Sequence, residues 1–419
     1  MTTWPRTVDF RRRIRPGDTV VWSHAGAEPT SLITQFLDQR HTFGGPVNVF
    51  LTGVSFSETV RPEHSDVVTF SSIGGLGTHR RLADAGCLDV VPLRYGDLPS
   101  MIERREVSVD VAMVIGTAPG PDGLVSLGPT VAVSREVLAS ARVSYLEINP
   151  NVPYLGGDAL VAVEDFDEVV YGDEPLVTMP LSDGPPSAVS ERICAHIAGL
   201  IIDGATVQLG IGSVGVNLPG FLRNHRDLGI HSAILTDPLV DLIQAGVANG
   251  SRKERDPGVA VAGELLGSEK LYRYADHNAA VALRRSADLL DAGVLGGFRR
   301  FVSVNSALQV DLTGQVNAEA MGATHVGAVG GQVDFVRAGA GSAEGLSVIA
   351  LPATARGCSR IVAALDGGVV TTARSEVDAV VTEYGVARLR GLTLSRRAAA
   401  LEAIAHPDHR EALRGQGLC

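Results

Sequence analysis

Residues 16–22 read Pro16-Gly-Asp-Thr-Val-Val-Trp22, a turn signal that runs into a short apolar stretch, and this pattern predicts a β-strand. The small-residue loop Ser23–Pro29 follows it. Thr30–Gln39 then places apolar residues at helical spacing, and Val47–Leu51 predicts a second strand. This order of strand, loop, helix and strand predicts parallel βαβ units, so we expect a fold of the α/β class.

The same rhythm returns in the second half of the chain. Ser190–Leu200 has the spacing of an amphipathic helix, and Gly204–Gly215 predicts a buried strand that runs into a glycine loop. Between the two halves, residues 172–188 are dominated by turn residues and show no period, which is typical of a linker. We therefore expect two α/β domains, residues 1–180 and 181–419, with a boundary near residue 180.

The composition fits a globular α/β protein and excludes several other classes. Of the 419 residues, 45% are hydrophobic and 20% are charged, and 48 are glycine. The net charge of -11 argues against a protein that binds nucleic-acid backbones. No apolar run reaches the roughly 18–20 residues that span a membrane, and the first residues lack the apolar core of a signal peptide. We expect a cytoplasmic protein with no nucleic-acid or membrane partner.

The cysteines give no sign of a disulfide framework or a metal site. Cys87, Cys194, Cys358 and Cys419 lie far apart and form no Cys-x-x-Cys pair. A zinc site would need closer spacing or nearby histidines. We expect free thiols in a reducing compartment, and no metal.

Two stretches in the second half carry chemical signals. Gly327–Phe335 reads Gly-Ala-Val-Gly-Gly-Gln-Val-Asp-Phe, and the backbone N–H groups of its glycines have no Cβ to shield them from a developing oxyanion. The run before it, Ser303–Asn317, is more polar than a plain core strand. A glycine-rich loop alone is most often a turn, so neither stretch decides a function without the other motifs.

Taken with Val381-Thr-Glu-Tyr-Gly385, these stretches closely resemble the acetyl-CoA hydrolase/transferase family, which includes 4-hydroxybutyrate and acetate CoA-transferases. The motifs are Asn305-Ser-Ala-Leu-Gln-Val-Asp-Leu-Thr-Gly-Gln-Val-Asn317 and Gly330-Gly-Gln-Val-Asp-Phe335, and the resemblance extends along nearly the whole chain. It implies two open α/β domains with the active site at their interface. It also implies a homo-oligomer with no tightly bound cofactor, whose substrates are an acyl-CoA and an acyl or CoA acceptor.

The resemblance also shows where the nucleophile of the family belongs. In the family a glutamate attacks the acyl-CoA carbonyl, and CoA then becomes a glutamyl thioester, because a carboxylate can act both as nucleophile and as leaving group. The usual pattern is His-Ser/Thr-Glu-x-x-x-Asp. This chain has His231-Ser-Ala-Ile-Leu-Thr-Asp237, with Ala233 at the glutamate position. Alanine has no lone pair and cannot form the anhydride.

Three explanations follow from Ala233. The chain is an inactivated variant of a CoA-transferase; or another nucleophile has replaced the glutamate, with Glu264 at the end of an apolar strand as the leading candidate; or the acyl group passes directly to an external acceptor. A carboxyl group at a strand end is more often part of the structure than of the chemistry, so the role of Glu264 is open.

The resemblance assigns further residues to the site. It implies that Asn305 is a polar group near the acyl oxygen, and that Glu383 faces the substrate. Two glycine loops offer backbone N–H groups, and Arg356 could face phosphate oxygens of CoA. Each has a structural alternative: a strand-end turn, a helix-capping carboxylate, tight packing or a solvated arginine. The residues of the two loops are Gly212, Ser213, Val214, Gly330, Gly331 and Gln332.

The function that we expect is therefore the handling of a small acyl-CoA thioester at a CoA-transferase-type site. A thioesterase or an acyltransferase to an amine or alcohol, without a covalent enzyme intermediate, is one alternative. A non-catalytic acyl-CoA binding protein is the other.

Overall fold

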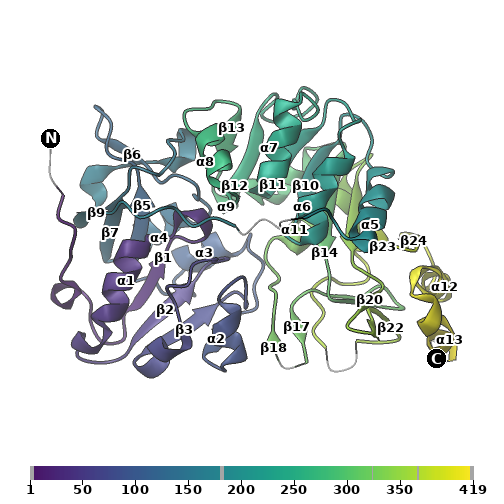
Figure 1. Cartoon of the computed structure of the whole chain (residues 1–419), viewed down its shortest axis with the longest axis horizontal. Helices are drawn as coiled ribbons and strands as arrows, with labels where there is room; N and C mark the ends of the chain where they lie inside the picture. The colour runs from purple at the N-terminus through teal and green to yellow at the C-terminus, as the bar shows by residue number, and fades with distance from the viewer. Residues whose placement is uncertain (1–3, 180–183, 323, 366–367, 416–419) are drawn as a thin grey trace. The chain divides into compact units, whose positions relative to one another are not determined.

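The computed structural model describes residues 4–179, 184–322, 324–365 and 368–415 (Figure 1). By its internal contacts the chain divides into unit 1, Met1–Leu181 with Val261–Leu289, and unit 2, Ser182–Ala260 with Leu290–Cys419. The expected boundary near residue 180 lies outside the described residues, as does Cys419. The expected division into residues 1–180 and 181–419 stays a prediction.

Unit 1 is built on a seven-stranded sheet in the order β4-β3-β2-β1-β5-β7-β9, with every neighbouring pair parallel. The strands are β1 (Thr19–Trp22), β2 (Val47–Leu51), β3 (Val68–Ser72), β4 (Leu88–Val90), β5 (Val111–Gly116), β7 (Val143–Ile148) and β9 (Glu168–Tyr171). The helices between them are α1 (Thr30–Asp38), α2 (Arg80–Asp84), α3 (Leu98–Glu103) and α4 (Ser134–Ser140). The predicted helix and the second predicted strand are thus confirmed.

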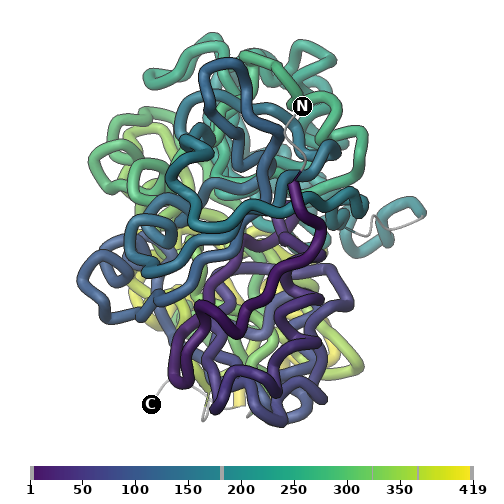
Figure 2. The backbone as a smooth tube through the Cα atoms, turned by 90° about the vertical axis from the view of Figure 1, so that its left-hand side faces the viewer, coloured from purple at the N-terminus to yellow at the C-terminus, as the bar shows by residue number. Residues whose placement is uncertain are grey.

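Two smaller parts complete unit 1. An antiparallel pair joins β6 (Leu124–Ser126) to β8 (Leu160–Ala162). The returning segment carries β12 (Ala260–Leu265), α8 (Glu269–Ala275), β13 (Val281–Leu283) and α9 (Ser286–Leu289). Figure 2 shows the first segment of the chain as a purple tube, and it is tied to the end of unit 1 by the ion pair of Arg6 with Asp173 at 2.8 Å.

The core of unit 1 forms where α1 covers β1. Phe36 of α1 is fully buried and lies edge-on to Trp22 of β1, and it stacks on Phe43 with 5.3 Å between ring centroids. Removing such a ring usually costs about 3–5 kcal/mol of stability. The apolar spacing of Thr30–Asp38 therefore fixes which face of the helix meets the sheet, and with it where the loop from β1 to α1 runs.

Unit 2 is built around six strands of the second sheet, in the order β11-β10-β14-β19-β23-β24. Neighbouring strands from β10 to β23 pair in parallel, and β24 is antiparallel. The strands of unit 2 in this sheet are β10 (Thr206–Leu209), β11 (Gly229–Leu235), β14 (Phe301–Ser306), β19 (Leu346–Ala350), β23 (Ala379–Thr382) and β24 (Gly385–Arg388).

The remaining elements of unit 2 are helices and short strand pairs. The helices are α5 (Ala188–Ala198), α6 (Ser213–Asn217), α7 (Asp237–Gln244), α10 (Ala292–Gly296), α11 (Gln332–Gly341), α12 (Leu394–Ile404) and α13 (Pro407–Gly415). The short strands are β15 (Gln309–Asp311), β16 (Val316–Asn317), β17 (Ala320–Met321), β18 (Thr324–His325), β20 (Thr354–Ala355), β21 (Cys358–Ser359) and β22 (Ile361–Val362). Among the described helices, none is long and apolar enough to cross a membrane.

Candidate functional site

The predicted residues of unit 2 gather at the carboxyl ends of parallel strands. These ends meet at one edge of a sheet, which is where α/β proteins bind ligands. Gly210 directly follows β10, Asn305 is the next-to-last residue of β14, and Glu383 directly follows β23. The strand order brings these three ends to the same edge although they are far apart in the sequence.

Ala233 lies in one row with two of these residues. In the register of the sheet, Val207 of β10 pairs with Ile230 in β11, and Leu209 of β10 pairs with Val304 in β14. Three positions further along β10 and β11, Gly210 is level with Ala233. One position further along β10 and β14, Gly210 is level with Asn305, so the three residues form one row across neighbouring strands. Residues in one row of a parallel sheet face the same side. All residues of β11 are buried except Ala233, which is partly exposed.

The amide of Asn305 is held by a second amide from the same face of the sheet. Asn305 Nδ2 donates to Gln208 Oε1 at 3.1 Å, and Gln208 Nε2 donates to Asn305 Oδ1 at 3.2 Å. Both side chains are buried. An asparagine amide has two N–H donors, so one N–H of Asn305 remains beyond this pair. The pair fixes the direction in which that N–H points.

The loop after β10 needs glycine for close backbone packing. A Cβ on Gly212 would meet the Ser306 hydroxyl at 2.5 Å. Gly212 is the residue before α6, whose first residues are Ser213, which is exposed, and Val214, which is buried. The predicted loop Gly212–Val214 thus contacts the end of β14, one residue beyond Asn305.

The second predicted loop begins α11. Gly330 has a φ of +52°, a conformation that favours glycine, and Gly331 is the N-terminal cap residue of the helix. The side-chain amide of Gln332 donates to the hydroxyl of Thr372 at 3.0 Å. The hydrogen bonds described for Gln332 therefore tie this loop to the segment before β23, and no contact described here joins it to Ala233.

Glu383 and Arg356 differ in their surroundings. Glu383 is buried, and its Oε2 accepts a hydrogen bond from the backbone N–H of Ala353 at 2.8 Å, which ties the end of β23 to the loop after β19. Arg356 is exposed at the tip of the hairpin between β20 and β21, where Arg356 and Gly357 both have positive φ, at 50° and 78°. Positive φ at both central residues is typical of a tight hairpin turn.

Glu264 belongs to unit 1, where it ends up in a cluster of buried polar side chains. Its carboxylate Oε2 lies 3.0 Å from Nε2 of His24, and the two side chains keep 11% and 6% of their exposure. His24 Nδ1 lies 2.9 Å from the Thr52 hydroxyl, and the Tyr95 hydroxyl lies 3.4 Å from His24 Nε2. The imidazole is therefore contacted at both ring nitrogens.

The two neighbouring strands of unit 1 explain how this cluster forms. His24 lies two residues after β1 and Thr52 directly after β2, and parallel pairing of β1 with β2 brings them together. A Cβ on Gly53 would fall 2.2 Å from His24 Cδ2, so only glycine leaves room for the ring. The backbone of Glu264 forms an antiparallel bridge with Thr130, whose hydroxyl donates to the carbonyl of His24 at 3.3 Å.

Other titratable groups surround the cluster. Burial raises the pKa of the Glu28 carboxyl to about 7, although the Ser57 hydroxyl donates to it at 2.5 Å. Burial, with the nearby charge of His24 second, lowers the pKa of His79 to about 4. Burial, followed by the charges of Glu264 and Glu136, raises the pKa of the Tyr95 hydroxyl well above its usual value. At neutral pH, His79 and Tyr95 are therefore uncharged.

Several of these residues were missed by the sequence interpretation. His24 lies in a loop that was described only as rich in small residues, yet a histidine two residues after the first strand and a glutamate four residues later are the signal that could have found it. Gln208 is a polar residue within a short buried strand, which is the equivalent signal in unit 2. Tyr95 and Thr52 carry no such signal, because their role depends on pairing between strands that the sequence does not specify.

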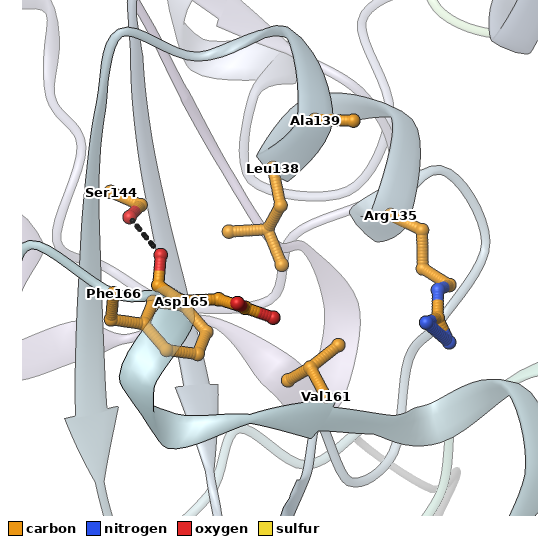
Figure 3. A pocket seen from close by; sticks show the side chains of 7 residues that line it. All are labelled: Arg135, Leu138, Ala139, Ser144, Val161, Asp165 and Phe166. Carbon is orange, nitrogen blue, oxygen red and sulfur yellow. Dashed lines mark hydrogen bonds between the residues drawn. The ribbon is translucent and has the colours of Figure 1, made fainter.

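A separate pocket in unit 1 contains none of the predicted residues. Its volume is about 260 Å³, and Leu138 of α4 and Val161 of β8 point into it (Figure 3). At one side the Ser144 hydroxyl donates to the carbonyl of Asp165 at 3.3 Å, and Arg135 donates to the carbonyl of Leu160 at 3.1 Å. The carbonyl groups of Asp165 and Leu160 are thus hydrogen-bonded within the protein. Among the described residues, no group of three or more His, Cys, Asp or Glu side chains is placed to hold a metal ion.

Comparison with known proteins decides the family. Residues 9–180 match the acetyl-CoA hydrolase/transferase N-terminal domain, and residues 267–416 match the C-terminal domain of the same family. The chain is 36% identical to the 4-hydroxybutyrate coenzyme A transferase of Clostridium kluyveri over 406 residues, which is 96% of this chain and 94% of that protein. The chain belongs to the acetyl-CoA hydrolase/transferase family.

Solved structures of similar proteins agree with this assignment. The chain is similar to RipA from Yersinia pestis, with a TM-score of 0.89 and 31% identity over 96% of this chain and 94% of that one. It is also similar to a 4-hydroxybutyrate CoA-transferase from Porphyromonas gingivalis, with a TM-score of 0.80 and 32% identity over 97% and 94% of the two chains. The fold is that of CoA-transferases, and the protein is an acyl-CoA transferase/hydrolase family enzyme whose family implies acyl-CoA substrates.

Proposed function

We propose that the protein acts on a short acyl-CoA and transfers the acyl group directly to an acceptor, without the glutamyl-CoA intermediate of its family. The observation that carries this proposal is the row of Ala233, Gly210 and Asn305 at the strand ends of unit 2. Ala233 is the partly exposed residue of β11, at the place where the family resemblance puts the glutamate. The proposal takes Ala233 to stand in place of the attacking carboxylate.

Without that carboxylate, the groups of unit 2 can still polarise a thioester carbonyl. The remaining N–H of Asn305 is neutral, so it costs less to remove from water than a charge. The backbone N–H groups of Gly212–Val214, Gly330 and Gly331 are the proposed donors to the oxyanion, whereas that of Gln332 donates to the Val329 carbonyl at 3.3 Å. Removing one such donor from an enzyme typically costs roughly 10²–10³ in rate, so these donors contribute to catalysis apart from any nucleophile.

The acceptor class follows from the same argument. A CoA-transferase that uses a glutamyl thioester exchanges one carboxylic acid for another, because CoA is held on the enzyme while the acids change places. A protein that cannot hold CoA in this way must release it as the free thiol when the acyl group leaves. We propose that the acceptor is a hydroxyl, an amine or water. We also propose that the enzyme is a homo-oligomer, as the family resemblance implies.

Product analysis tests this proposal. The protein is incubated with acetyl-CoA or butyryl-CoA, together with an isotope-labelled carboxylic acid and a panel of small alcohols and amines. We expect free CoA and an acylated acceptor or free acid, with no labelled acyl-CoA. Turnover to labelled acyl-CoA would contradict the proposal, because that product requires CoA transfer between acids. Tight binding with no product would instead support a non-catalytic acyl-CoA binding protein.

A further inference from the structure

We propose that unit 1 holds a binding site for a small aromatic carboxylate, in a pocket that contains none of the site residues named above. The pocket has a volume of about 310 Å³ and lies between the loop that joins β7 to β8 and the segment that runs from the end of α8 through β13. All of its lining residues belong to unit 1, so the site is complete within one unit. The proposal concerns binding alone and does not depend on the proposed function.

The charge of the lining favours an anion. Arg284 and His277 line the pocket, and among the described residues of the lining none is an aspartate or glutamate, although the chain has a net charge of -11. A Cβ on Gly157 would lie 3.7 Å from Nη1 of Arg284, so the guanidinium adjoins the backbone of the loop. A guanidinium can bind both oxygens of one carboxylate, which makes arginine the usual partner of this group.

Two carboxylates near the pocket are engaged elsewhere. Asp276 Oδ1 accepts a hydrogen bond from the backbone N–H of Tyr154 at 2.7 Å, and Asp158 Oδ2 accepts one from the backbone N–H of Arg285 at 3.2 Å. Neither aspartate lines the pocket. They hold the two segments together and leave the positive charge of the lining to a ligand.

The backbone of the loop presents donors and not acceptors. The carbonyl of Gly156 accepts from the N–H of Ala159 at 3.5 Å, and the carbonyl of Gly157 accepts from the N–H of Leu160. The N–H groups of Gly156 and Gly157 donate to no group within the part of the chain that the structure describes, and both glycines are exposed. Exposed N–H groups without a Cβ beside them are open to the oxygens of an anion.

Two aromatic rings supply the flat surface of the pocket. Tyr154 and His277 both line it, and their rings stack with 4.6 Å between centroids and 12° between planes. The backbone fixes this stack, because the carbonyl of Tyr154 accepts from the N–H of His277 at 2.9 Å. His277 has a φ of 54°, which is uncommon for a residue with a Cβ and persists only where the surroundings enforce it. A ligand ring that packs on such a stack gains roughly two- to tenfold in affinity.

The size of the pocket limits the ligand. Pockets that bind small molecules have volumes of roughly 300–1,000 Å³, and this one lies at the lower end of that range. One ring with one carboxylate suits this volume, whereas CoA, with its nucleotide and long pantetheine arm, is too large. We therefore assign the pocket to a separate small molecule and not to the acyl-CoA.

Isothermal titration calorimetry of the full chain with benzoate tests the proposal. We expect saturable binding of one benzoate to the pocket of the wild type. Benzyl alcohol has the same ring without the charge, and acetate has the charge without the ring, so both should bind more weakly than benzoate. Inorganic phosphate, an anion without a ring, should also bind more weakly.

Variants of the lining show where benzoate binds. Arg284→Gln should weaken benzoate binding roughly ten- to a hundredfold, the usual contribution of a hydrogen bond to a charged group, and should remove the preference for benzoate over benzyl alcohol. His277→Asn should weaken it roughly two- to tenfold, since asparagine tolerates the positive φ but has no ring. Arg273→Gln is the matched control, because Arg273 is an exposed arginine of α8 that does not line the pocket.

Each outcome decides the question. No measurable binding of benzoate to the wild type overturns the proposal. Equal affinities of the wild type and Arg284→Gln also overturn it, because benzoate then binds elsewhere. Acetate or phosphate bound as tightly as benzoate would contradict the role of the stacked rings. Should Arg284→Gln fail to fold by circular dichroism, His277→Asn decides, and an unchanged affinity for benzoate in that variant rejects the site. None of these measurements requires turnover, so their failure is distinct from a failure of the proposed function.

Discussion

The row of Ala233, Gly210 and Asn305 in unit 2 and the cluster around His24 in unit 1 differ in chemical type. In unit 2 the row of Ala233, Gly210 and Asn305 contains a methyl group, a bare backbone and a neutral amide. In unit 1 the cluster around His24 contains an imidazole and two buried carboxyl groups, Glu28 and Glu264. Neutral groups can polarise a carbonyl, whereas titratable groups can move protons.

This difference indicates how a family that normally uses one carboxylate could work without it. A glutamate at position 233 would combine attack and release in a single side chain. With alanine there, the row of unit 2 keeps groups that can polarise a carbonyl, and Glu383 is a buried carboxyl group at the same edge of that sheet. Each of the following substitutions changes only one of the two regions, so its effect can be assigned to that region.

The largest effect is expected for Ala233→Glu, which places a carboxylate where the family resemblance puts the nucleophile. We expect exchange of CoA between carboxylic acids to rise by about 10³ or more, since that is the order of loss when a covalent nucleophile is deleted. Exchange is measured as transfer of CoA from acetyl-CoA to labelled butyrate. Ala233→Gln is the control, because it has nearly the same size and no nucleophilic oxygen anion. If both variants exchange CoA at the wild-type rate, position 233 does not face the thioester.

The next effect is expected for Asn305→Ala in the same row. The change removes the proposed donor to the acyl oxygen and leaves the buried amide of Gln208 without its partner. We expect kcat to fall by roughly 10²–10³ and the protein to lose about 1–3 kcal/mol of stability. Steady-state kinetics measures the change in kcat, and denaturant unfolding measures the change in stability. Gln208→Ala should cause a similar loss of stability with a smaller loss of kcat, and equal losses of kcat would contradict a direct role for Asn305.

A third effect concerns the pH dependence of stability and tests the burial of Glu28 in unit 1. Its folded pKa of about 7 lies above the ordinary value of 4.5, so the folded state holds this proton more tightly than the unfolded state. Its contribution to the free energy of unfolding is complete below pH 4.5 and is lost as the pH rises to about 7, by about 3 kcal/mol in all.

Glu28→Gln should remove that dependence. The measurement is the difference in unfolding free energy between the wild type and the variant, followed from pH 4.5 to 8 by denaturant titration. We expect the wild type to lose stability relative to the variant over this range. A difference that stays constant with pH would show that Glu28 is solvated and that the cluster is more open than described.

The smallest effect is expected for Arg356→Ala at the exposed hairpin tip of unit 2. If this arginine meets phosphate oxygens of CoA, its loss should raise the KM for acyl-CoA by about three- to tenfold at low salt, and the difference should shrink at high salt. The kcat should not change. A KM that is unchanged at every salt concentration would place Arg356 outside the CoA site.

The fold was predictable from local sequence, and the reason is physical. The apolar spacing of Thr30–Asp38 and the apolar runs of β1 and β2 are patterns among residues that are close in the sequence. Such patterns can be recognised without knowing which other elements each segment packs against. The glycine loops and the polar residues at strand ends were also visible. Their grouping at one edge of the sheet then follows from the parallel order of the strands.

The cluster of unit 1 could not be predicted in the same way. His24 and Glu264 are joined by a contact of 3.0 Å, yet they come from the loop after β1 and from a segment that returns to unit 1 late in the chain. Glu264 was noticed because a carboxyl group is unusual in an apolar run, but its partner depends on tertiary contacts that no local pattern carries. The pairing of Gln208 with Asn305 was missed for the same reason, since it depends on the register of β10 with β14.

The most direct test of the central claim is intact-protein mass spectrometry of the wild type during turnover of an acyl-CoA, with Ala233→Glu as the positive control. The account predicts no increase in mass for the wild type and an added CoA on the variant. A stable CoA or acyl adduct on the wild-type chain would contradict direct transfer, because it would show that the enzyme forms a covalent intermediate with another of its own side chains.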